Sequence, residues 1–309
     1  MKSRLKFIYN EILIPYSPDS ISYQLRYFKH HKRICDYRFP KKFSEKIFHR
    51  MRYPSPVLAR LSDKLLARDY IGSIIGTDHL VPLIGIYSHL TADDLEKMEG
   101  GFVIKANHGS GHVRVVKDGR AEDLAAIARE ANAWLDEDFS ARHGERHYKA
   151  IVPMLIVEEA LLEDGASPAD YKCHIFNPGP SEPPFVYVQV IRGRFGRQRE
   201  DIYLESWTPA PFRNVDHDQN EGYGVDGKPA LFDEMIGLAK RLAGPFGYCR
   251  VDCYLHADRI FIGELTFTPA AGMTRFDPPE WDLLLGRKFG WPEAAWTGDP
   301  AVAGAPAAS

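Results

Sequence analysis

The sequence predicts an α+β fold, on three observations. Short runs rich in β-branched and aromatic residues, such as 102–105 and 249–255, come in neighbouring pairs that are typical of hairpins. Residues 121–138 and 231–242 have the apolar spacing of amphipathic helices. Strands and helices do not alternate in regular βαβα order, which argues against a doubly wound parallel sheet.

The composition is that of a globular protein, with 44% hydrophobic and 26% charged residues in 309. No apolar run reaches the roughly 20 residues that span a bilayer, and no cleavage site follows the basic start, so we expect a cytoplasmic protein. The four cysteines offer no second close pair for zinc, and we expect reduced, buried thiols. They are Cys35, Cys173, Cys249 and Cys253.

The first quarter of the chain is predicted to be helical and is strongly basic. Residues 1–68 hold 16 Lys and Arg against 5 Asp and Glu, whereas the remainder is acidic. This segment could bind an anionic partner such as an acidic polysaccharide, or make a peripheral membrane contact. It could equally dock on the acidic remainder. None of the usual nucleic-acid motifs is present, so we expect no nucleic acid.

A strand ending in Lys105 leads into a loop, 107–111, that contains Gly109 and Gly111. Glycines let backbone N–H groups approach a phosphate closely, and lysine adds a positive charge. The loop does not have the Walker A pattern, and by itself a plain β-turn explains it as well.

The segment 249–266 reads as a hairpin with an apolar and a polar face. Because side chains alternate along a strand, Arg250, Asp252 and Tyr254 share one face, and Glu264 shares a face with Thr266. A three-residue turn would pair Asp252 with Glu264, whereas a two-residue turn would place them on opposite faces. Paired carboxylates suit Mg²⁺, although an exposed hairpin with a polar face is the other interpretation.

Together these segments resemble the ATP-grasp superfamily, and more closely its TupA-like branch of teichuronopeptide biosynthesis. The matching phrases run in the family's order from Asp63-Lys64 to about residue 286. They are 102–111, with Asn-His-Gly-Ser-Gly; 156–159; 170–172; 250–254; and 263–269, Gly-Glu-Leu-Thr-Phe-Thr-Pro.

The resemblance implies two α+β lobes that sandwich ATP, with the helical basic segment before them. The implied domains are 1–68, a small lobe at 69–157 with the phosphate loop, and a large lobe at 158–295 with the metal site. Residues 296–309 are rich in Ala, Gly and Pro and are expected to be a disordered tail.

The resemblance also implies roles for single residues. Lys64 and Lys105 are expected at the ATP phosphates, under a loop formed by His108, Gly109, Ser110 and Gly111. Glu158, Glu159 and Leu161 are expected to form a hinge that contacts adenine, with Asp170 at the ribose. Asp252, Glu264 and Thr266 are expected to hold Mg²⁺, and the catalytic positions are Arg250, Lys172 and His174.

Two features depart from the wider superfamily. Thr266 stands where many relatives have a metal-binding asparagine, although the closer branch also has threonine. Many relatives also begin with a Rossmann-like domain, for which the helical first 60 residues are too short.

The implied function is an ATP-dependent carboxylate–amine ligase that works through an acyl phosphate, in the synthesis of a cell-surface polysaccharide or teichuronopeptide-type polymer. The acid would be a uronic or amino acid, and Arg194 and Arg197 are predicted to bind it. His108 and His174 are candidate bases for the amine, although a single histidine is more often structural. An ATP-grasp phosphotransferase and a binding module without turnover are the alternatives.

Overall fold

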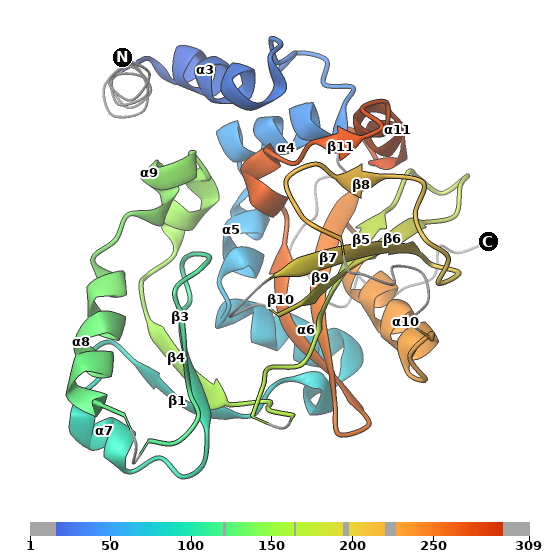
Figure 1. The fold of residues 1–309 in the computed structure, drawn as a ribbon. Helices are drawn as coiled ribbons and strands as arrows, with labels where there is room; N and C mark the ends of the chain where they lie inside the picture. The colour runs from blue at the N-terminus through green and yellow to red at the C-terminus, as the bar shows by residue number, and fades with distance from the viewer. Residues whose placement is uncertain (1–16, 120–121, 164, 194–197, 220–226, 293–309) are drawn as a thin grey trace.

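The computed structural model describes residues 17–119, 122–163, 165–193, 198–219 and 227–292. Two antiparallel sheets lie side by side, each with helices of its own, as Figure 1 shows. Within the described residues, no helix is both long and apolar enough to cross a membrane. The predicted tail and the first 16 residues lie outside the described part of the chain.

The smaller sheet has four strands in the order β1-β4-β2-β3. Its strands are β1 (Leu83–Tyr87), β2 (Phe102–Ala106), β3 (Val113–Val116) and β4 (Leu155–Glu159). Two helices, α7 (Ala92–Glu96) and α8 (Leu124–Leu135), close its apolar core. The helix predicted at 121–138 is shorter at both ends. It starts after Asp123 because the side chain of Asp123 caps it by accepting the backbone N–H of Ala126.

The larger sheet has five strands in the order β10-β9-β5-β6-β7. They are β5 (Asp170–Phe176), β6 (Phe185–Arg192), β7 (Arg199–Leu204), β9 (Tyr248–His256) and β10 (Arg259–Thr266). The apolar side chains of β9 enter a core with α5 (Pro56–Ser62), α6 (Leu66–Ile75) and α10 (Phe232–Ala243). All four cysteines are free and buried, as expected.

The opposite face of the larger sheet is covered at one end only. There α3 (Asp19–His31), α4 (Phe43–Arg52) and α11 (Trp281–Lys288) pack on Phe176, Tyr187 and Tyr248 in a second apolar core. Because these helices stop at that end, the rest of this face faces the smaller sheet (Figure 1).

Two basic side chains of α4 point into the protein. Lys46 donates to the carbonyl oxygens of Gly286 and Phe289 at 2.8 and 2.7 Å, and buried Arg50 donates to those of Phe267 and Tyr248. These two cations of the basic segment therefore bind backbone carbonyls of the protein itself, which net charge does not predict.

The chain forms two helices, α5 and α6, on either side of Asp63. The chain breaks at Asp63, whose Oδ1 accepts the N–H of Leu65 at 2.8 Å and starts α6 as a new helix. The break matters because it places Lys64 outside a helix, beside the glycine loop. The predicted domain boundary after residue 68 falls within α6, which packs on the larger sheet.

The shorter elements lie around these two sheets. They are η2 (Thr77–His79), α9 (Phe139–His143), η3 (Arg146–Ala150), β8 (Arg213–Asn214), η4 (Pro269–Gly272) and β11 (Phe276–Asp277). Helix α9 and η3 connect the smaller sheet's helices to the N-terminal helices, because Tyr23 of α3 donates a hydrogen bond to the carbonyl of Gly144.

The hairpin of β9 and β10 corrects one expectation. Its turn has two residues, Ala257 and Asp258, both with positive φ, and such a turn was expected to separate the two carboxylates. A β-bulge at Gly263 adds one residue to β10, so that Glu264 nevertheless pairs with Asp252.

Replacing Gly263 with alanine is expected to destabilise the protein by about 1–3 kcal/mol, because the new Cβ would lie 2.7 Å from the ring of Tyr254. Chemical denaturation measures the change. The control is Gly237 in α10, which has no neighbour within 4 Å and where alanine should stabilise by up to about 1 kcal/mol. Equal effects at both positions would contradict this account of the bulge.

Candidate active site

Three rows of paired residues cross the uncovered face of the larger sheet. Strands β5 and β9 pair in register, so that Asp170 lies opposite Tyr254, Lys172 opposite Asp252, and His174 opposite Arg250. On the other side of β9, β10 places Glu264 beside Asp252 and Thr266 beside Arg250. Strand alternation thus puts the predicted catalytic and metal-binding side chains on one face.

The two carboxylates of this face are surrounded by cations. Arg250 holds Asp252 with two hydrogen bonds, of 2.6 Å from Nε and 2.8 Å from Nη2, and Lys172 lies 2.6 Å from it. Arg250 also reaches Glu264 at 3.2 Å, and Lys64 lies 3.5 Å from Glu264. Three positive charges against two negative ones leave a surplus that suits an anion such as a phosphate.

Both carboxylates stay ionised. Burial alone would raise the pKa of Asp252, but Arg250 and Lys172 outweigh it and hold that pKa well below its usual range. Burial likewise opposes ionisation of Glu264, and Lys64 and Arg250 lower its pKa overall. The pair is therefore a fixed double negative charge at neutral pH.

Among the described residues, no group of three or more His, Cys, Asp or Glu is placed to hold a metal ion alone. The site offers two carboxylates, with the Thr266 hydroxyl 3.3 Å from Glu264 Oε1. Mg²⁺ commonly takes one or two protein carboxylates and completes its shell with water and phosphate. The donors therefore fit a Mg²⁺ ion that arrives with a nucleotide.

Lys105 is held by Glu158 on the neighbouring strand. Glu158 accepts from Lys105 Nζ at 2.6 Å and from Arg68 Nη1 at 2.7 Å, and its side chain is 8% exposed. Thus Glu158, expected in the hinge, directs its carboxylate to the lysine. A single carboxylate orients both cations.

Asn107 fixes the start of the glycine loop. Its side-chain amide donates to Asp63 Oδ1 at 3.1 Å and to the Val152 carbonyl at 3.0 Å, and its Oδ1 accepts the N–H of Met154 at 2.8 Å. Lys64 donates to the carbonyl of Gly109. The loop is therefore tied at its base to both the α5–α6 break and the chain before β4.

The tip and the histidine of this loop face opposite ways. Ser110 and Gly111 are exposed, and Gly111 has a φ of +87°, which favours glycine. His108 is buried, with Nε2 3.1 Å from the Trp134 carbonyl of α8, and burial lowers its pKa. The imidazole of His108 thus packs on α8, whereas Ser110 lines a cavity described below.

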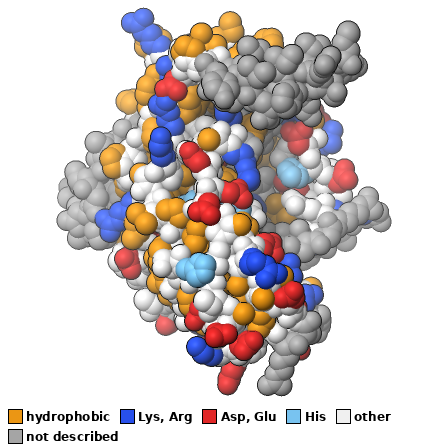
Figure 2. Space-filling view, turned by 90° about the vertical axis from the view of Figure 1, so that its left-hand side faces the viewer, with side chains coloured by type: hydrophobic (Ala, Val, Ile, Leu, Met, Phe, Trp, Pro, Cys, Tyr) orange, Lys and Arg blue, Asp and Glu red, His pale blue; other side chains and the backbone are white. Residues whose placement is uncertain are grey.

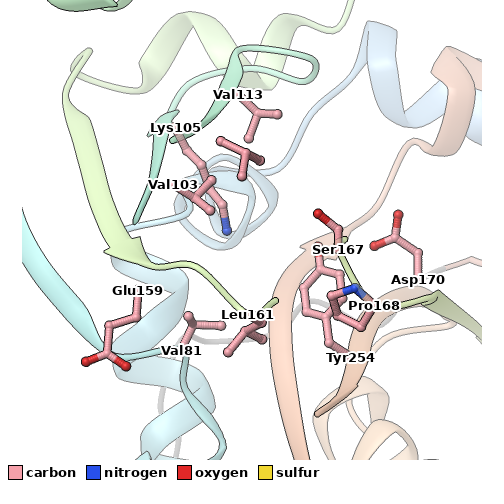
Figure 3. Close-up of a pocket in the computed structure, with 11 residues that line it drawn as sticks. Val81, Val103, Lys105, Val113, Glu159, Leu161, Ser167, Pro168, Asp170 and Tyr254 are labelled. Carbon is pink, nitrogen blue, oxygen red and sulfur yellow. The ribbon is translucent and has the colours of Figure 1, made fainter. Parts of the chain in front are cut away.

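A small apolar pocket of about 60 Å³ lies between the two sheets (Figure 3). Lys105 points into it from β2, opposite Asp170 on β5. A flat aromatic base would fit between its apolar walls. The walls are formed by Val81, Val103, Val113, Val115, Leu161, Pro168 and Tyr254.

The predicted hinge runs along the edge of this pocket. The N–H of Glu159 bonds to the Pro82 carbonyl and that of Ala160 to the Gly101 carbonyl. The N–H of Leu161 makes no backbone hydrogen bond to a described residue, and Leu161 lines the pocket, so this N–H is a candidate donor to a base. Figure 3 shows the Glu159 carboxylate turned away from the other labelled side chains.

His174 lies in one of these rows, opposite Arg250, but is not among the residues that line either cavity. Its ring stacks on Tyr187 at 4.2 Å, Nε2 lies 2.6 Å from Gln189 Oε1 and Nδ1 lies 2.8 Å from the Tyr248 hydroxyl. Burial lowers its pKa well below the usual value. This environment suits a structural side chain beside Arg250 better than the base that the sequence suggested.

A second, polar cavity of about 290 Å³ adjoins the charged rows. Arg250, Glu264 and Thr266 line it, together with Glu145 and Thr268. Glu145 is 6% exposed. Sequence reasoning missed it, because it lies in no motif and comes between α9 and η3, more than 100 residues from the hairpin that it faces.

The two arginines predicted to bind the acid, Arg194 and Arg197, lie outside the described residues. Their neighbour Arg192 pairs with buried Asp201 at 3.0 Å. Figure 2 shows the side of the molecule that carries the smaller sheet, where basic, acidic and apolar side chains are interspersed. The described surface on this side has no continuous basic area.

The comparisons with known proteins point to one family. The sequence model of the TupA-like ATP-grasp family matches residues 45–290. A search of curated proteins gave no match.

Two solved structures are distantly similar. D-alanine–D-alanine ligase from Bacillus anthracis, complexed with ATP, is 16% identical, covering 75% of this chain and 68% of that one, with a TM-score of 0.38. The Helicobacter pylori enzyme is 14% identical, covering 82% and 68%, with a TM-score of 0.42. Similarity at this level adds nothing to the assignment of the site.

Proposed function

Because this chain belongs to the TupA-like family of ATP-grasp proteins, we propose that it is an ATP-dependent ligase that joins a carboxylate to an amine. One observation carries the proposal. A single sheet face leads from the apolar pocket at Tyr254, across the pair Asp252 and Glu264, to the polar cavity at Arg250. This arrangement supports adjacent sites for the nucleotide, the metal ion and the acceptor.

The proposed nucleotide site uses both sheets. The base lies between the valines of the smaller sheet and Tyr254, with Leu161 as a backbone donor and Asp170 at the ribose. Lys105 and Lys64 contact the phosphates under the glycine loop. A lysine gives a compact positive charge, which suits a phosphate that moves during reaction.

The first proposed step forms an acyl phosphate. A carboxylate oxygen of the substrate attacks the γ-phosphorus of ATP, and ADP leaves. When bound between Asp252 and Glu264, Mg²⁺ would neutralise charge on the phosphates. Arg250 lies at the junction with the polar cavity and stabilises the negative charge of the transferred group.

The second proposed step forms the amide. An amine in the polar cavity attacks the acyl carbon, and phosphate leaves. We propose a uronic or amino acid as the carboxylate, in the making of a cell-surface polymer. The family match and the polar lining of the cavity support that choice.

The test is a ³¹P NMR assay of the purified protein with Mg²⁺-ATP, uronic acids and amino acids. ADP and free phosphate should appear together, and only when both an acid and an amine are present. Phosphate retained on an organic product would instead indicate a phosphotransferase. AMP with pyrophosphate would also contradict the proposed acyl-phosphate route.

A further inference from the structure

Glu145 has a position that the proposed reaction does not yet use. It lines the polar cavity together with Arg250 and Glu264, at the start of η3, and is 6% exposed. Thr268 donates to Oε1 at 2.5 Å. The other oxygen, Oε2, makes no hydrogen bond to a described residue. It is also not fully enclosed by the protein. One carboxylate oxygen is thus available to the contents of the cavity.

We propose that Glu145 is the general base that takes a proton from the amine substrate in this cavity. The inference rests on the proposed ligase function and adds a catalytic residue to it. It also names the class of the second substrate, a primary amine that enters as its ammonium form.

The cavity walls favour this assignment over the other candidates. Glu264 and Asp252 are neutralised by cations, whereas Glu145 has no ion pair to a described residue. His108 packs on α8, and His174 has both nitrogens bonded. An ammonium ion at Glu145 would therefore meet an uncompensated carboxylate beside the Arg250 end of the site.

The electrostatic setting makes Glu145 a suitable base near neutral pH. Burial raises its pKa to about 7, against the opposing effects of Thr268 and Arg250, and Glu264 adds to the rise. A base works best when its pKa is near the working pH. The charged and titratable side chains that line the cavity with it are Arg142 of α9, Tyr148 of η3, Asp216 and His217 after β8, Arg250 of β9 and Glu264 of β10.

The proton and electron changes balance. The Glu145 carboxylate takes one proton from R–NH₃⁺, leaving R–NH₂ with a free electron pair. That pair forms the C–N bond to the acyl carbon while the C–O bond to phosphate breaks. The phosphate leaves with the bonding electrons and takes the second amine proton, and Glu145 then releases its proton to solvent.

The pH dependence follows from the sign of the shift. Glu145 is ionised, and can accept a proton, above its raised pKa, so kcat/KM for the amine should fall about tenfold per unit as pH drops below 7. In Glu145→Gln the reaction must start from free amine. At pH 7.5 the rate of this variant should be lower than that of wild type by about 10²-fold or more. Its rate should rise with pH as the concentration of free amine increases.

The experiment uses hydroxylamine, which is neutral at pH 7 and needs no base. The full chain and Glu145→Gln are given Mg²⁺-ATP and D-glucuronate, D-galacturonate, L-glutamate or D-glutamate. One arm contains hydroxylamine, and hydroxamate is measured. The other contains glycine, L-alanine, D-alanine or L-lysine, and amide is measured. Glu137→Gln, which changes a carboxylate outside the cavity, is the control, and unchanged thermal melting verifies folding.

The expected result is that Glu145→Gln keeps hydroxamate formation, loses amide formation and loses the wild-type pH profile, with partial recovery in Glu145→Asp. Amide formation equal to wild type overturns the inference. Loss of hydroxamate formation in Glu145→Gln also overturns the inference, because the reaction with hydroxylamine needs no base for the amine. Wild-type hydroxamate without any amide excludes these primary amines and overturns it too. No hydroxamate from wild type with any acid overturns the proposed function itself.

Discussion

Replacing Asp252 with asparagine is expected to lower kcat/KM for Mg²⁺-ATP by about 10³-fold. Asparagine keeps the size of the side chain but removes one of the two paired charges proposed to hold Mg²⁺. It also removes the carboxylate that orients Arg250 and Lys172, which both bond to it within 2.8 Å. Turnover is measured as ADP released, at saturating acid and amine.

The matched control is Asp201→Asn. Asp201 is also fully buried and paired with an arginine, Arg192, but this pair belongs to β6 and β7 and lines neither cavity. Both variants should lose stability, since each leaves a cation without its partner. Only Asp252→Asn should lose turnover. Equal turnover in the two variants would show that the loss reflects general destabilisation rather than the site.

Replacing Glu158 with glutamine is expected to lower the free energy of unfolding by about 3 kcal/mol without nucleotide, because Lys105 and Arg68 lose a shared partner that is largely buried. Mg²⁺-ATP should restore much of that loss, since its phosphates can neutralise the freed Lys105. The rise in Tm on adding Mg²⁺-ATP should therefore be larger in this variant than in wild type. Thermal melting with and without nucleotide measures both effects.

Glu159→Gln is the control for this second prediction. Glu159 is the next residue, is exposed and makes no ion pair to a described residue. The substitution removes its charge and leaves the backbone of the predicted hinge unchanged. Its Tm and its response to Mg²⁺-ATP should match those of wild type. A Glu158 variant with a normal nucleotide response would contradict the idea that Glu158 and ATP compete for Lys105.

The sequence predicted the parts of the fold that depend on local pattern. Strand alternation placed Arg250 and Asp252 on one face and the cysteines of the same strand on the other, and the structure confirms both. The phrase around Glu264 and the glycine loop identified the family, which the match to residues 45–290 confirms. Short motifs succeed here because each depends on residues that are neighbours in the chain.

Local reasoning failed where a single residue changes the geometry. The sequence left the turn length open. The turn has the two residues that were expected to separate the carboxylates, but the bulge at Gly263 restores their pairing. The bulge does not change hydrophobic periodicity, and so it does not appear in the pattern.

The sequence by itself determined the family, the lysines and carboxylates of the charged rows, and the alternation that brings them to one face. The tertiary structure alone decided that Glu158 holds Lys105 and that His174 is enclosed by Tyr187, Gln189 and Tyr248. It also decided that Glu145 lines the same cavity as Arg250. These contacts join residues far apart in the chain. Their burial and charge, which set pKa and reactivity, exist only once the sheets and helices have packed together.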